Sequence, residues 1–377
     1  MRTVFLTGAT GTIGSALVPR LLAEPSTTVR LLVRAADDGQ LKARLAAMLD
    51  YWGFKPGDPC ARRIAMLRGD ISAPNLGLSD GEHAAIAAEC SHLIHCAASV
   101  NLLMPLDQAR ATAVAPTRAI LQLGRMGASA GVLRKIDLVS TVGVWGRTPG
   151  RMPERRLPEV DSFHNTYEAA KAEAERVIWL EGQSLPISVH RPSMVVGETS
   201  TGRVIHFQIF YHLCEFLSGM RTYGVIPSLG DTRLDLIPVD WVASAIDWSS
   251  RHPAETAGAI YHLCSGPEGA IELTRLQQQV RMVWEAGRRP LPPIRRVPRG
   301  VLQALVPLIG AVAGPKTRRA LRALPPVLAY LAERQSFGNE QTARFFAAAG
   351  LPVPQISDYL GPVLQYYLKD RMSRGNQ

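Results

Sequence analysis

The feature that most limits the fold is a regular alternation, over residues 1–145, of short apolar segments and segments with helical periodicity. The apolar segments, rich in β-branched residues, are RTVFLTG, VRLLVRA, RIAMLRGDI, HLIHCAA and KIDLVSTVGVWG. Strands that are apolar on both faces and alternate with helices form a parallel sheet covered by helices on both sides. We therefore predict an α/β fold built on a doubly wound parallel sheet, in which ligands bind at the edge where the strands end.

The alternation returns later in the chain and is interrupted once. The later strand-like segments are PISVHRPSMVVG, the start of IPVDWVASAIDWSS, and IYHLCSG. We predict a nucleotide-binding domain at 1–199, re-entered by about 236–266, and a smaller, mostly helical, substrate-binding part at 200–235 and 267–377. The segment 146–159, rich in Pro, Gly and Arg, is predicted to be a loop that carries function or mobility.

A glycine-rich turn, TGATGTIG, lies between the first strand and the first helix. It places Gly8, Gly11 and Gly14 at GxxGxxG spacing, with Thr10 inside the turn. Glycine allows a tight turn and a close approach of the backbone, and the helix that follows directs its N-terminus at a pyrophosphate. In this strand–turn–helix context the turn predicts dinucleotide binding by a Rossmann-type domain.

The end of the second strand indicates which dinucleotide is bound. NAD-binding domains typically carry an acid there to hold the ribose hydroxyls, whereas this chain has Arg34, about 20 residues after Gly14. A guanidinium favours a 2′-phosphate, so we predict NADP, supplied as NADPH. Arg44, on the next helix, is a second candidate for that phosphate. The alternative is that Arg34 is only a solvated side chain at a strand end.

Two further strand ends supply candidate cofactor contacts. RGDI ends the third strand, where Asp70 can accept a hydrogen bond from the adenine amino group and Ile71 lies next to it. CAAS ends the fourth strand, where the small side chains of Ala97 and Ala98 let a cofactor lie against the backbone.

The candidate catalytic residues come from the fifth strand and the helix after it. Ser140 and Thr141 end the strand, while Tyr167 and Lys171 stand four residues apart, on one face of the helix NTYEAAKAEAE. Carbonyl reduction needs a proton donor at the developing oxyanion, and a neighbouring ammonium favours a reactive tyrosine. Thr141 can hydrogen-bond the substrate oxygen, and Lys171 can also hold the nicotinamide ribose. Strand register decides which of the two strand-end hydroxyls points inward.

The remaining charges of the helix NTYEAAKAEAE call for a simpler interpretation. Glu173 and Glu175 lie beyond the Tyr–Lys pair, and we predict that both are solvated charges that stabilise the helix.

The cysteines and the hydropathy indicate a compartment. The five Cys form no C-x-x-C pair, which fits reduced thiols in the cytoplasm. CSHLIHC could suggest zinc, but a buried strand explains it better, so we expect no metal site. We expect no signal peptide, and the absence of 18 successive apolar residues predicts no spanning helix.

The net charge of +10 is concentrated in one block. Residues 281–322 hold ten Lys or Arg and one acid, Glu285. Such a block attracts phosphates, acidic proteins or anionic lipid, or is simply a solvated surface. No nucleic-acid-binding pattern accompanies it, so we predict no nucleic-acid partner. Within it, GVLQALVPLIGAVAG (300–314) is too short to span a membrane and fits core, an acyl tunnel or peripheral membrane contact.

These motifs together resemble the extended short-chain dehydrogenase/reductases, and more narrowly the thioester-reductase and fatty acyl-CoA reductase (male-sterility) type. The narrower resemblance covers roughly residues 1–266 and is carried by LVRAADDGQLKARL, GDISAPNLGLSD, IHCAASVNLLMP, RPSMVVGETSTG and LDLIPVDWVASAI. The C-terminal segment FGNEQTARFFAAAGLPVPQISDYLGPVLQYYL is loosely similar to the tail of such reductases. The sequence departs from many relatives at Ala170, where they carry Ser.

The resemblance implies a catalytic triad of Thr141, Tyr167 and Lys171. It implies as cofactor contacts Gly8, Thr10, Gly11, Gly14, Arg34 and Asp70, with Arg44 a further candidate. It also implies a substrate: an acyl thioester of coenzyme A or of an acyl carrier protein with its phosphopantetheine arm, reduced to an aldehyde and in some members on to an alcohol. Since we detect no carrier or adenylation domain, we expect a stand-alone reductase.

Two alternatives stay open at this point. The chain could be another extended family member, such as a hydroxysteroid-type dehydrogenase or a sugar-nucleotide epimerase or dehydratase, although Arg34 argues against the NAD-dependent epimerases. It could also be a non-catalytic NADP-binding protein, against which the Thr–Tyr–Lys set argues.

Overall fold

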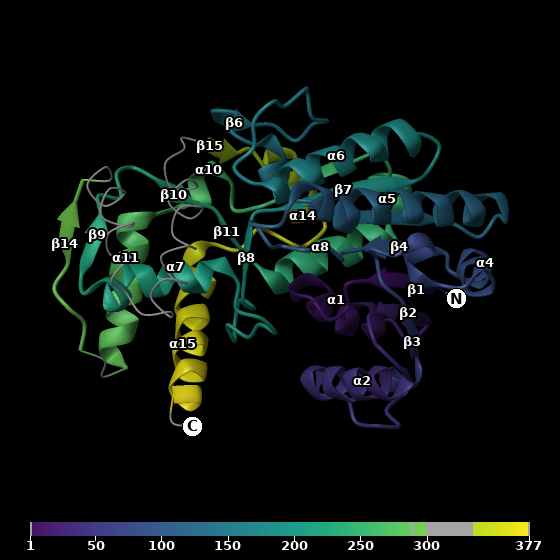
Figure 1. Ribbon diagram of the computed structural model, residues 1–377, viewed down its shortest axis with the longest axis horizontal. Helices are drawn as coiled ribbons and strands as arrows, with labels where there is room; N and C mark the ends of the chain where they lie inside the picture. Colours follow the sequence, from purple (N-terminus) through teal and green to yellow (C-terminus); the bar gives the residue numbers. More distant parts are fainter. Residues whose placement is uncertain (1, 288–289, 299–334, 376–377) are drawn as a thin grey trace.

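The computed structural model describes residues 2–287, 290–298 and 335–375. Within these ranges, seven parallel strands form a central sheet in the order β12-β7-β5-β4-β1-β2-β3 (Figure 1). Their bounds are β1 Arg2–Thr7, β2 Thr27–Val33, β3 Ile64–Arg68, β4 His92–His95, β5 Lys135–Val139, β7 Ile187–Pro192 and β12 Ile260–Leu263. The doubly wound parallel sheet predicted from the apolar alternation is confirmed.

Helices cover both faces of the sheet because each carries an apolar face that must be buried. On one face lie α1 (Thr12–Ala23) and α8 (Val239–Arg251), which share a core with β1 and β2. On the other lie α4 (Asp80–Glu89), α5 (Leu106–Ser129) and α6 (Thr166–Glu181). The outer helices are α2 (Asp38–Trp52), α3 (Pro59–Arg62) and the 3-10 turn η1 (Pro74–Gly77).

The register of the central strands brings the predicted site segments to one edge. Thr7 of β1 pairs with His95 of β4, and His95 pairs with Leu138 of β5. Because these strands run parallel, the segments that follow them leave the sheet side by side. The glycine turn, the CAAS segment and the Ser140–Thr141 pair therefore meet at the carboxyl edge.

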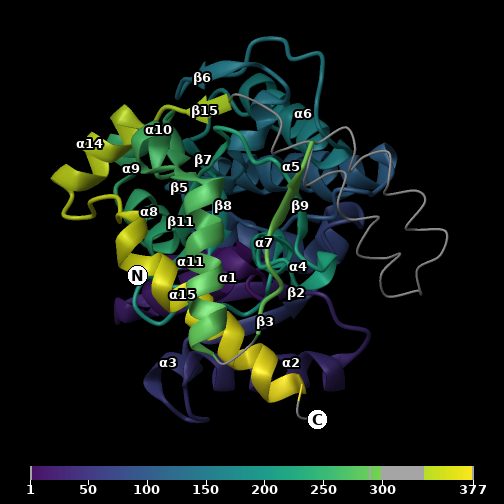
Figure 2. The ribbon, with the colours of Figure 1, turned by 90° about the vertical axis from the view of Figure 1, so that its left-hand side faces the viewer.

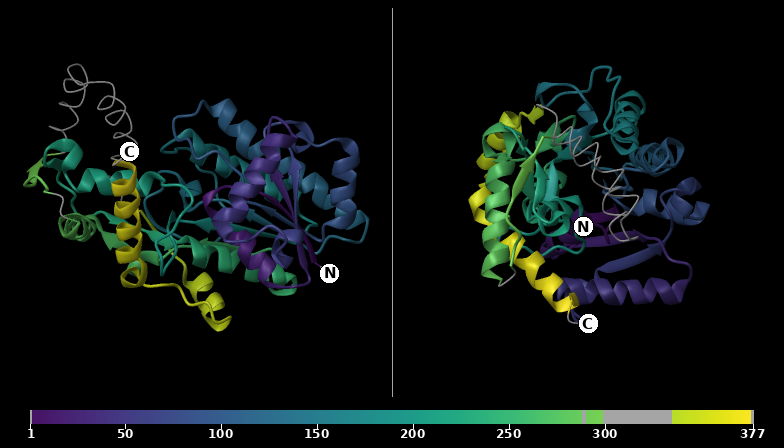
Figure 3. Two further views of the ribbon diagram at one scale, coloured as in Figure 1. Left: turned by 90° about the horizontal axis from the view of Figure 1, so that it is seen from below. Right: turned by 60° about the vertical axis from the view of Figure 1, so that its left-hand side comes forward.

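A second group of elements packs beside this edge. Its helices are α7 (Ile209–Leu217), α11 (Leu273–Ala286) and α15 (Ile356–Gly375), and its apolar cluster joins residues of both predicted substrate-binding segments. Figure 2 shows α11 and α15 close together, and Figure 3 shows them at the opposite end of the molecule from β1. The smaller elements are β8 Met194–Val196, η3 Met220–Thr222, β9 Val225–Pro227, β10 Arg233–Leu234, β11 Leu236–Pro238, α9 Pro253–Thr256, α10 Gly266–Gly269, β13 Ile271–Glu272 and β14 Arg295–Val297.

One helix of the C-terminal segment packs on the nucleotide-binding side. Phe346 of α14 (Glu340–Ala348) is fully buried in the same core as α1 and α8, with its ring 5.9 Å from that of Trp241. The division of the chain into two domains stays a prediction. Helix α14 belongs to the predicted substrate-binding segment 267–377 but packs on the nucleotide-binding side. The apolar segment 300–314 and most of the basic block 281–322 lie outside the described residues.

The segment predicted as a loop, 146–159, is tied down at several points. It contains β6 (Gly150–Met152), which pairs in parallel with β15 (Gln335–Phe337). The carboxylate of Glu154 then accepts hydrogen bonds from the backbone N–H groups of Gln341 and Thr342, which open α14. The N–H groups in the first turn of a helix have no acceptor inside that helix, so Glu154 acts as the N-terminal cap of α14.

Candidate active site

Helix α6 presents Tyr167 and Lys171 because of how it begins. The side chain of Asn165 accepts a hydrogen bond from the Glu168 N–H at 3.0 Å, which fixes the first turn. Tyr167 and Lys171 then lie on one face, one helical turn apart. Ala170 and Ala174 are buried against the sheet, and their small side chains let the helix approach it closely.

Lys171 is buried and held by the sheet. Its Nζ donates a 2.9 Å hydrogen bond to the carbonyl of Val139, the last residue of β5, and the residue is only 6% exposed. Burial lowers the pKa of Lys171 to about 8, although Cys96 and Glu175 act in the opposite direction. The ammonium form therefore persists at neutral pH and is lost as the pH rises through about 8.

Tyr167 keeps its proton near neutral pH. Burial, and then the charge of Glu168, raise the pKa of its phenol to about 12, and a side-chain hydrogen bond with Thr141 opposes this shift. A protonated phenol that is already hydrogen-bonded to a threonine can donate to a substrate oxygen.

Strand register distinguishes the two hydroxyls that follow β5. Thr141 Oγ1 accepts from the Gly143 N–H at 3.2 Å, opening the 3-10 helix η2 (Val142–Trp145), and also bonds the Tyr167 side chain. Ser140 is 6% exposed, and its Oγ has no hydrogen-bond partner among the described residues. The structure therefore brings Thr141, rather than Ser140, to Tyr167.

The glycine turn has the shape that a close-lying ligand needs. Gly8 has φ +83°, and a Cβ there would lie 2.7 Å from the Ala97 nitrogen. A Cβ on Gly14 would lie 2.1 Å from the Gly8 oxygen, so neither position tolerates a side chain without movement. Gly11 is the N-cap residue just before α1 and supplies no side-chain cap, which leaves the first N–H groups of the helix open to a ligand.

The residues predicted to contact the adenosine end lie at the outer part of the same edge. The Arg34 side chain is 77% exposed, and its guanidinium lies 4.0 Å from the carboxylate of Asp70. Asp70 Oδ1 accepts from the N–H and the hydroxyl of Ser72, and these bonds lower the pKa of the carboxyl group. Ile71 is half-buried, and Arg44 lies on α2. These contacts stay predictions.

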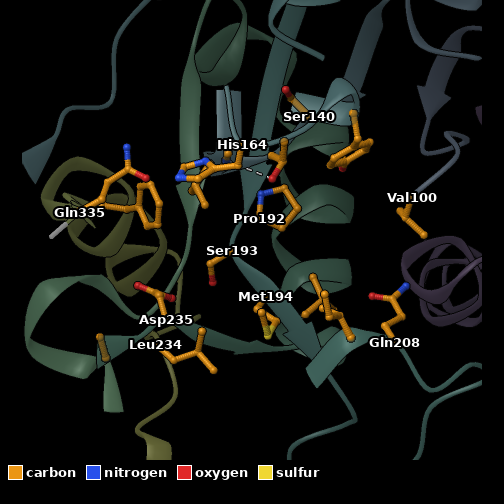
Figure 4. A pocket seen from close by; sticks show the side chains of 18 of the residues that line it. Val100, Ser140, His164, Pro192, Ser193, Met194, Gln208, Leu234, Asp235 and Gln335 are labelled. Atoms are coloured by element: carbon orange, nitrogen blue, oxygen red, sulfur yellow. Dashed lines mark hydrogen bonds between the residues drawn. The ribbon is translucent and has the colours of Figure 1, made fainter. Parts of the chain in front are cut away.

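A cavity of about 1490 Å³ joins the glycine turn to the Tyr–Lys pair. Among the predicted residues it is lined by Gly8, Gly11, Gly14, Ala98, Thr141, Tyr167 and Lys171. It extends past Ser193 and Met194 to the neighbourhood of β15. Figure 4 shows Ser140, His164 and Pro192 at one end, and Leu234 with Asp235 at the other. A cavity of this size has room for more than one small-molecule ligand.

Comparison with known proteins agrees with this geometry. The family model described as "Male sterility protein" matches residues 6–246, more than half of the chain. The chain belongs to the male sterility protein family. It is an extended short-chain dehydrogenase/reductase of the thioester reductase type, and the family is one of NAD(P)-binding oxidoreductases.

Relatives of this family member include a nonribosomal peptide synthetase and an aldehyde reductase. The non-canonical nonribosomal peptide synthetase FrzA of Cladobotryum sp is 30% identical over 77% of this chain and 28% of its own length. Aldehyde reductase lnaA of Aspergillus flavus is 30% identical over 69% of this chain and 25% of its own length. The chain thus spans about a quarter of the length of these curated relatives.

A solved relative covers the whole chain. The terminal R domain of the myxalamid PKS-NRPS biosynthetic pathway has a TM-score of 0.81 and 28% identity, and the match covers 100% of this chain and 91% of that one. The similarity confirms the predicted fold, a Rossmann-type sheet with a mostly helical C-terminal part.

Sequence reasoning missed the residues that close over the glycine turn in this family member. They come from the segment where the alternation is lost: His206 Nε2 lies 3.1 Å from the Thr10 carbonyl oxygen, and Gln208 Nε2 donates to Thr12 Oγ1 at 2.8 Å. Both line the cavity, as does Phe207. Nothing periodic marks them, because each is placed by a tertiary contact almost 200 positions away.

The prediction for Glu175 was wrong. Its side chain is 1% exposed instead of solvated, and it accepts a bidentate ion pair from Arg191 of β7, which is fully buried. Glu173 lies on the outer side, as predicted, and pairs with Arg110 at 2.8 Å. The eight-residue step from Tyr167 to Glu175 keeps the two on one helix face, which was the available signal.

The CSHLIHC segment is a buried strand at its centre, as predicted. His95 Nδ1 lies 2.7 Å from Thr7 Oγ1, and His92 Nδ1 lies 2.8 Å from Ser91 Oγ. Across residues 2–287, 290–298 and 335–375, no helix is both long and apolar enough to cross a bilayer.

Proposed function

We propose that the protein uses NADPH to reduce an acyl thioester to an aldehyde. The thioester would be carried by coenzyme A or by the phosphopantetheine arm of a carrier protein. One observation carries the proposal: a single cavity is lined both by the glycine turn and by Thr141, Tyr167 and Lys171. The stand-alone character expected from the sequence stays a prediction.

The residues around the glycine turn fit a dinucleotide. The cradle above Gly8 and Gly14 is too close-packed for any side chain, and the uncapped N-terminus of α1 offers N–H groups to a pyrophosphate. Lys171 is bonded to the end of β5, lines the same cavity as the glycine turn, and would hold the nicotinamide ribose. When bound, NADPH would supply a hydride to the thioester carbonyl carbon.

Arg34 supports NADPH over NADH. It is exposed at the end of β2, where its closest charged partner among the described residues, Asp70, is 4.0 Å away. Arg68 reaches the same edge, since its Nη1 donates to the Ala36 carbonyl at 3.3 Å. Two guanidinium groups at this edge favour the extra phosphate of NADPH.

The protein's own side chains would handle the oxygen and its proton. Thr141 and Tyr167 donate hydrogen bonds to the thioester carbonyl oxygen, which stabilises the negative charge that develops there. Tyr167 then transfers its proton to that oxygen, giving a hemithioacetal, and the Lys171 ammonium stabilises the phenolate left behind.

Collapse of the hemithioacetal completes the reaction. The carbon–sulfur bond breaks, the hydroxyl proton returns to Tyr167, and the sulfur leaves as a thiolate that takes a proton from solvent. The products are an aldehyde and a free thiol. A second hydride and proton delivered to the same site would give an alcohol.

Product analysis tests the proposal. The protein is incubated with NADPH and with one acyl group offered as the coenzyme A thioester, the carrier-protein thioester, and the free aldehyde. NADPH oxidation is followed together with mass spectrometry. Aldehyde and free thiol in equal amounts support the proposal, whereas NADPH oxidation only with the free aldehyde would point to another extended dehydrogenase.

A further inference from the structure

We propose that the buried Arg191–Glu175 ion pair positions the reductase site. It acts on catalysis through Lys171 and through the cavity wall, and this inference rests on the proposed function. Neither side chain lines the cavity, so neither contacts a ligand held there. Glu175 nevertheless shares a face of α6 with Tyr167 and Lys171, which connects the pair to the site.

The geometry of the pair is that of a clamp. Arg191 Nε donates to Glu175 Oε1 at 2.9 Å and Arg191 Nη2 to Oε2 at 2.5 Å, a bidentate arrangement with both side chains at 2% exposure or less. Such a fork fixes distance and orientation together. Glu175 follows Lys171 by one helical turn, so the pair anchors α6 to β7 immediately beyond the lysine.

The clamp also reaches the cavity wall. Arg191 Nη1 donates to the Arg155 carbonyl at 3.0 Å and to His262 Nε2 at 3.2 Å. His262 Nδ1 lies 2.8 Å from the Gly338 carbonyl, next to β15, which lines the cavity. Burial, and then Arg191, lower the pKa of His262 to about 3, so its ring is neutral and accepts from Arg191 while donating to Gly338.

The carboxylate of Glu175 acts electrostatically on Lys171. Burial costs the ammonium its hydration, and Glu175 is one of the groups that favour the charged form. The titratable and charged groups near Lys171 are His95 at the end of β4, Cys96 just after it, and Tyr167 and Glu175 on α6. Asp137 on β5 acts on Cys96, and Arg191 on β7 pairs with Glu175.

These neighbours do not titrate in the working range. Burial moves the pKa of His95 to about 3, and it moves the pKa of Cys96 and of Tyr167 to about 12. Burial would raise the pKa of Asp137, but Lys135 and other partners lower it overall. Between about pH 6 and pH 10, Lys171 thus changes charge while His95, Cys96, Tyr167 and Asp137 do not.

The test compares pH profiles of kcat/KM for the thioester, between about pH 6 and pH 10, in Glu175→Gln and in the matched control Glu173→Gln. Loss of the Glu175 charge makes the Lys171 ammonium harder to keep, so the alkaline limb should move down by roughly 0.5–1 pH unit. Glu173 faces outward to Arg110, and its variant should follow the wild type. Superimposable profiles for the two variants would overturn the proposal.

Arg191→Lys separates geometry from charge. It keeps the positive charge but loses the fork, so kcat should fall while the alkaline limb stays in place. Wild-type kcat in this variant would count against the clamp. If Glu175→Gln does not fold, the double variant Glu175→Gln/Arg191→Gln removes both charges of the pair, so Arg191 is not left buried without its partner. The alkaline limb of this double variant should also move down.

Failure of the proposed function would give a different result. If the wild type reduces no thioester, the pH dependence of NADPH binding, followed by fluorescence, still reports Lys171 in each variant. A shifted dependence in Glu175→Gln alone then supports the clamp without a thioester. An unshifted one overturns it.

Discussion

Lys171 Nζ donates a 2.9 Å hydrogen bond to the carbonyl of Val139, and this contact joins α6 to the end of β5. It places the ammonium at the last residue of β5, two positions before Thr141. Since the bond is made to a backbone group, it depends on the strand's position rather than on another side chain.

Replacing Tyr167 by Phe should abolish most turnover. The change removes the proton donor and its bond to Thr141 while leaving the ring, so thioester reduction should fall by about 10²–10⁴-fold. NADPH oxidation measures the rate, and cofactor fluorescence measures binding, which should persist. Tyr223→Phe, at a residue 88% exposed, is the control. Retention of wild-type turnover in the Tyr167 variant would refute the mechanism.

The rate should fall on the alkaline side of neutral pH. The Lys171 pKa of about 8 means that its ammonium is present below that pH and is lost above it. Tyr167, with a pKa of about 12, keeps its proton throughout the range. A profile of kcat/KM should therefore be flat below about pH 7 and decline above about pH 8. A rate that keeps rising to about pH 10 contradicts the role given to the ammonium.

Arg34→Ala should weaken NADPH selectively. Losing a charge-assisted contact to the 2′-phosphate should raise the KM for NADPH roughly tenfold or more and leave the KM for NADH nearly unchanged. Steady-state kinetics with both cofactors measure the ratio. Arg30→Ala is the matched control, because Arg30 lies on the same strand but pairs with Glu89. Equal changes for the two cofactors would show that Arg34 does not read the phosphate.

Gly14→Ala should disturb the glycine turn. Gly81→Ala, which lies outside the turn, is its matched control. The new Cβ would lie 2.1 Å from the Gly8 oxygen, so the backbone must shift, at a cost of about 1–3 kcal/mol in unfolding free energy. Gly81 lies in α4, and a Cβ added there would meet no heavy atom within 4 Å outside its own stretch of helix. Alanine at this position should therefore be neutral or slightly stabilising. Denaturant unfolding and NADPH titration of both variants are the measurements. Equal stability and equal affinity would exclude a tight cradle at Gly14.

The sequence was most informative where local pattern and chemistry coincide. Apolar strands predicted the parallel sheet, and Gly8 and Gly14 predicted the tight turn, because backbone approach excludes side chains whatever the rest of the fold does. The i, i+4 spacing of Tyr167 and Lys171 predicted a shared face, since helix geometry alone sets it.

The sequence was least informative where polarity suggested solvent. Glu175 was interpreted as a surface charge: its spacing from Tyr167 indicates the inward helix face, but no local pattern shows that a buried arginine 16 residues later pairs with it. The segment 146–159 was interpreted as a loop, because Pro, Gly and Arg favour turns, yet β6 finds its partner in β15.

By itself, the sequence determined the sheet, the glycine turn and the shared helix face of Tyr167 and Lys171, which all follow from short-range periodicity and steric limits. Only the tertiary structure decided that Thr141 rather than Ser140 meets Tyr167, that His206 and Gln208 close over the turn, and that Glu175 is clamped by Arg191. These depend on strand register and on contacts between distant segments, which exist only once burial has fixed the position of each element.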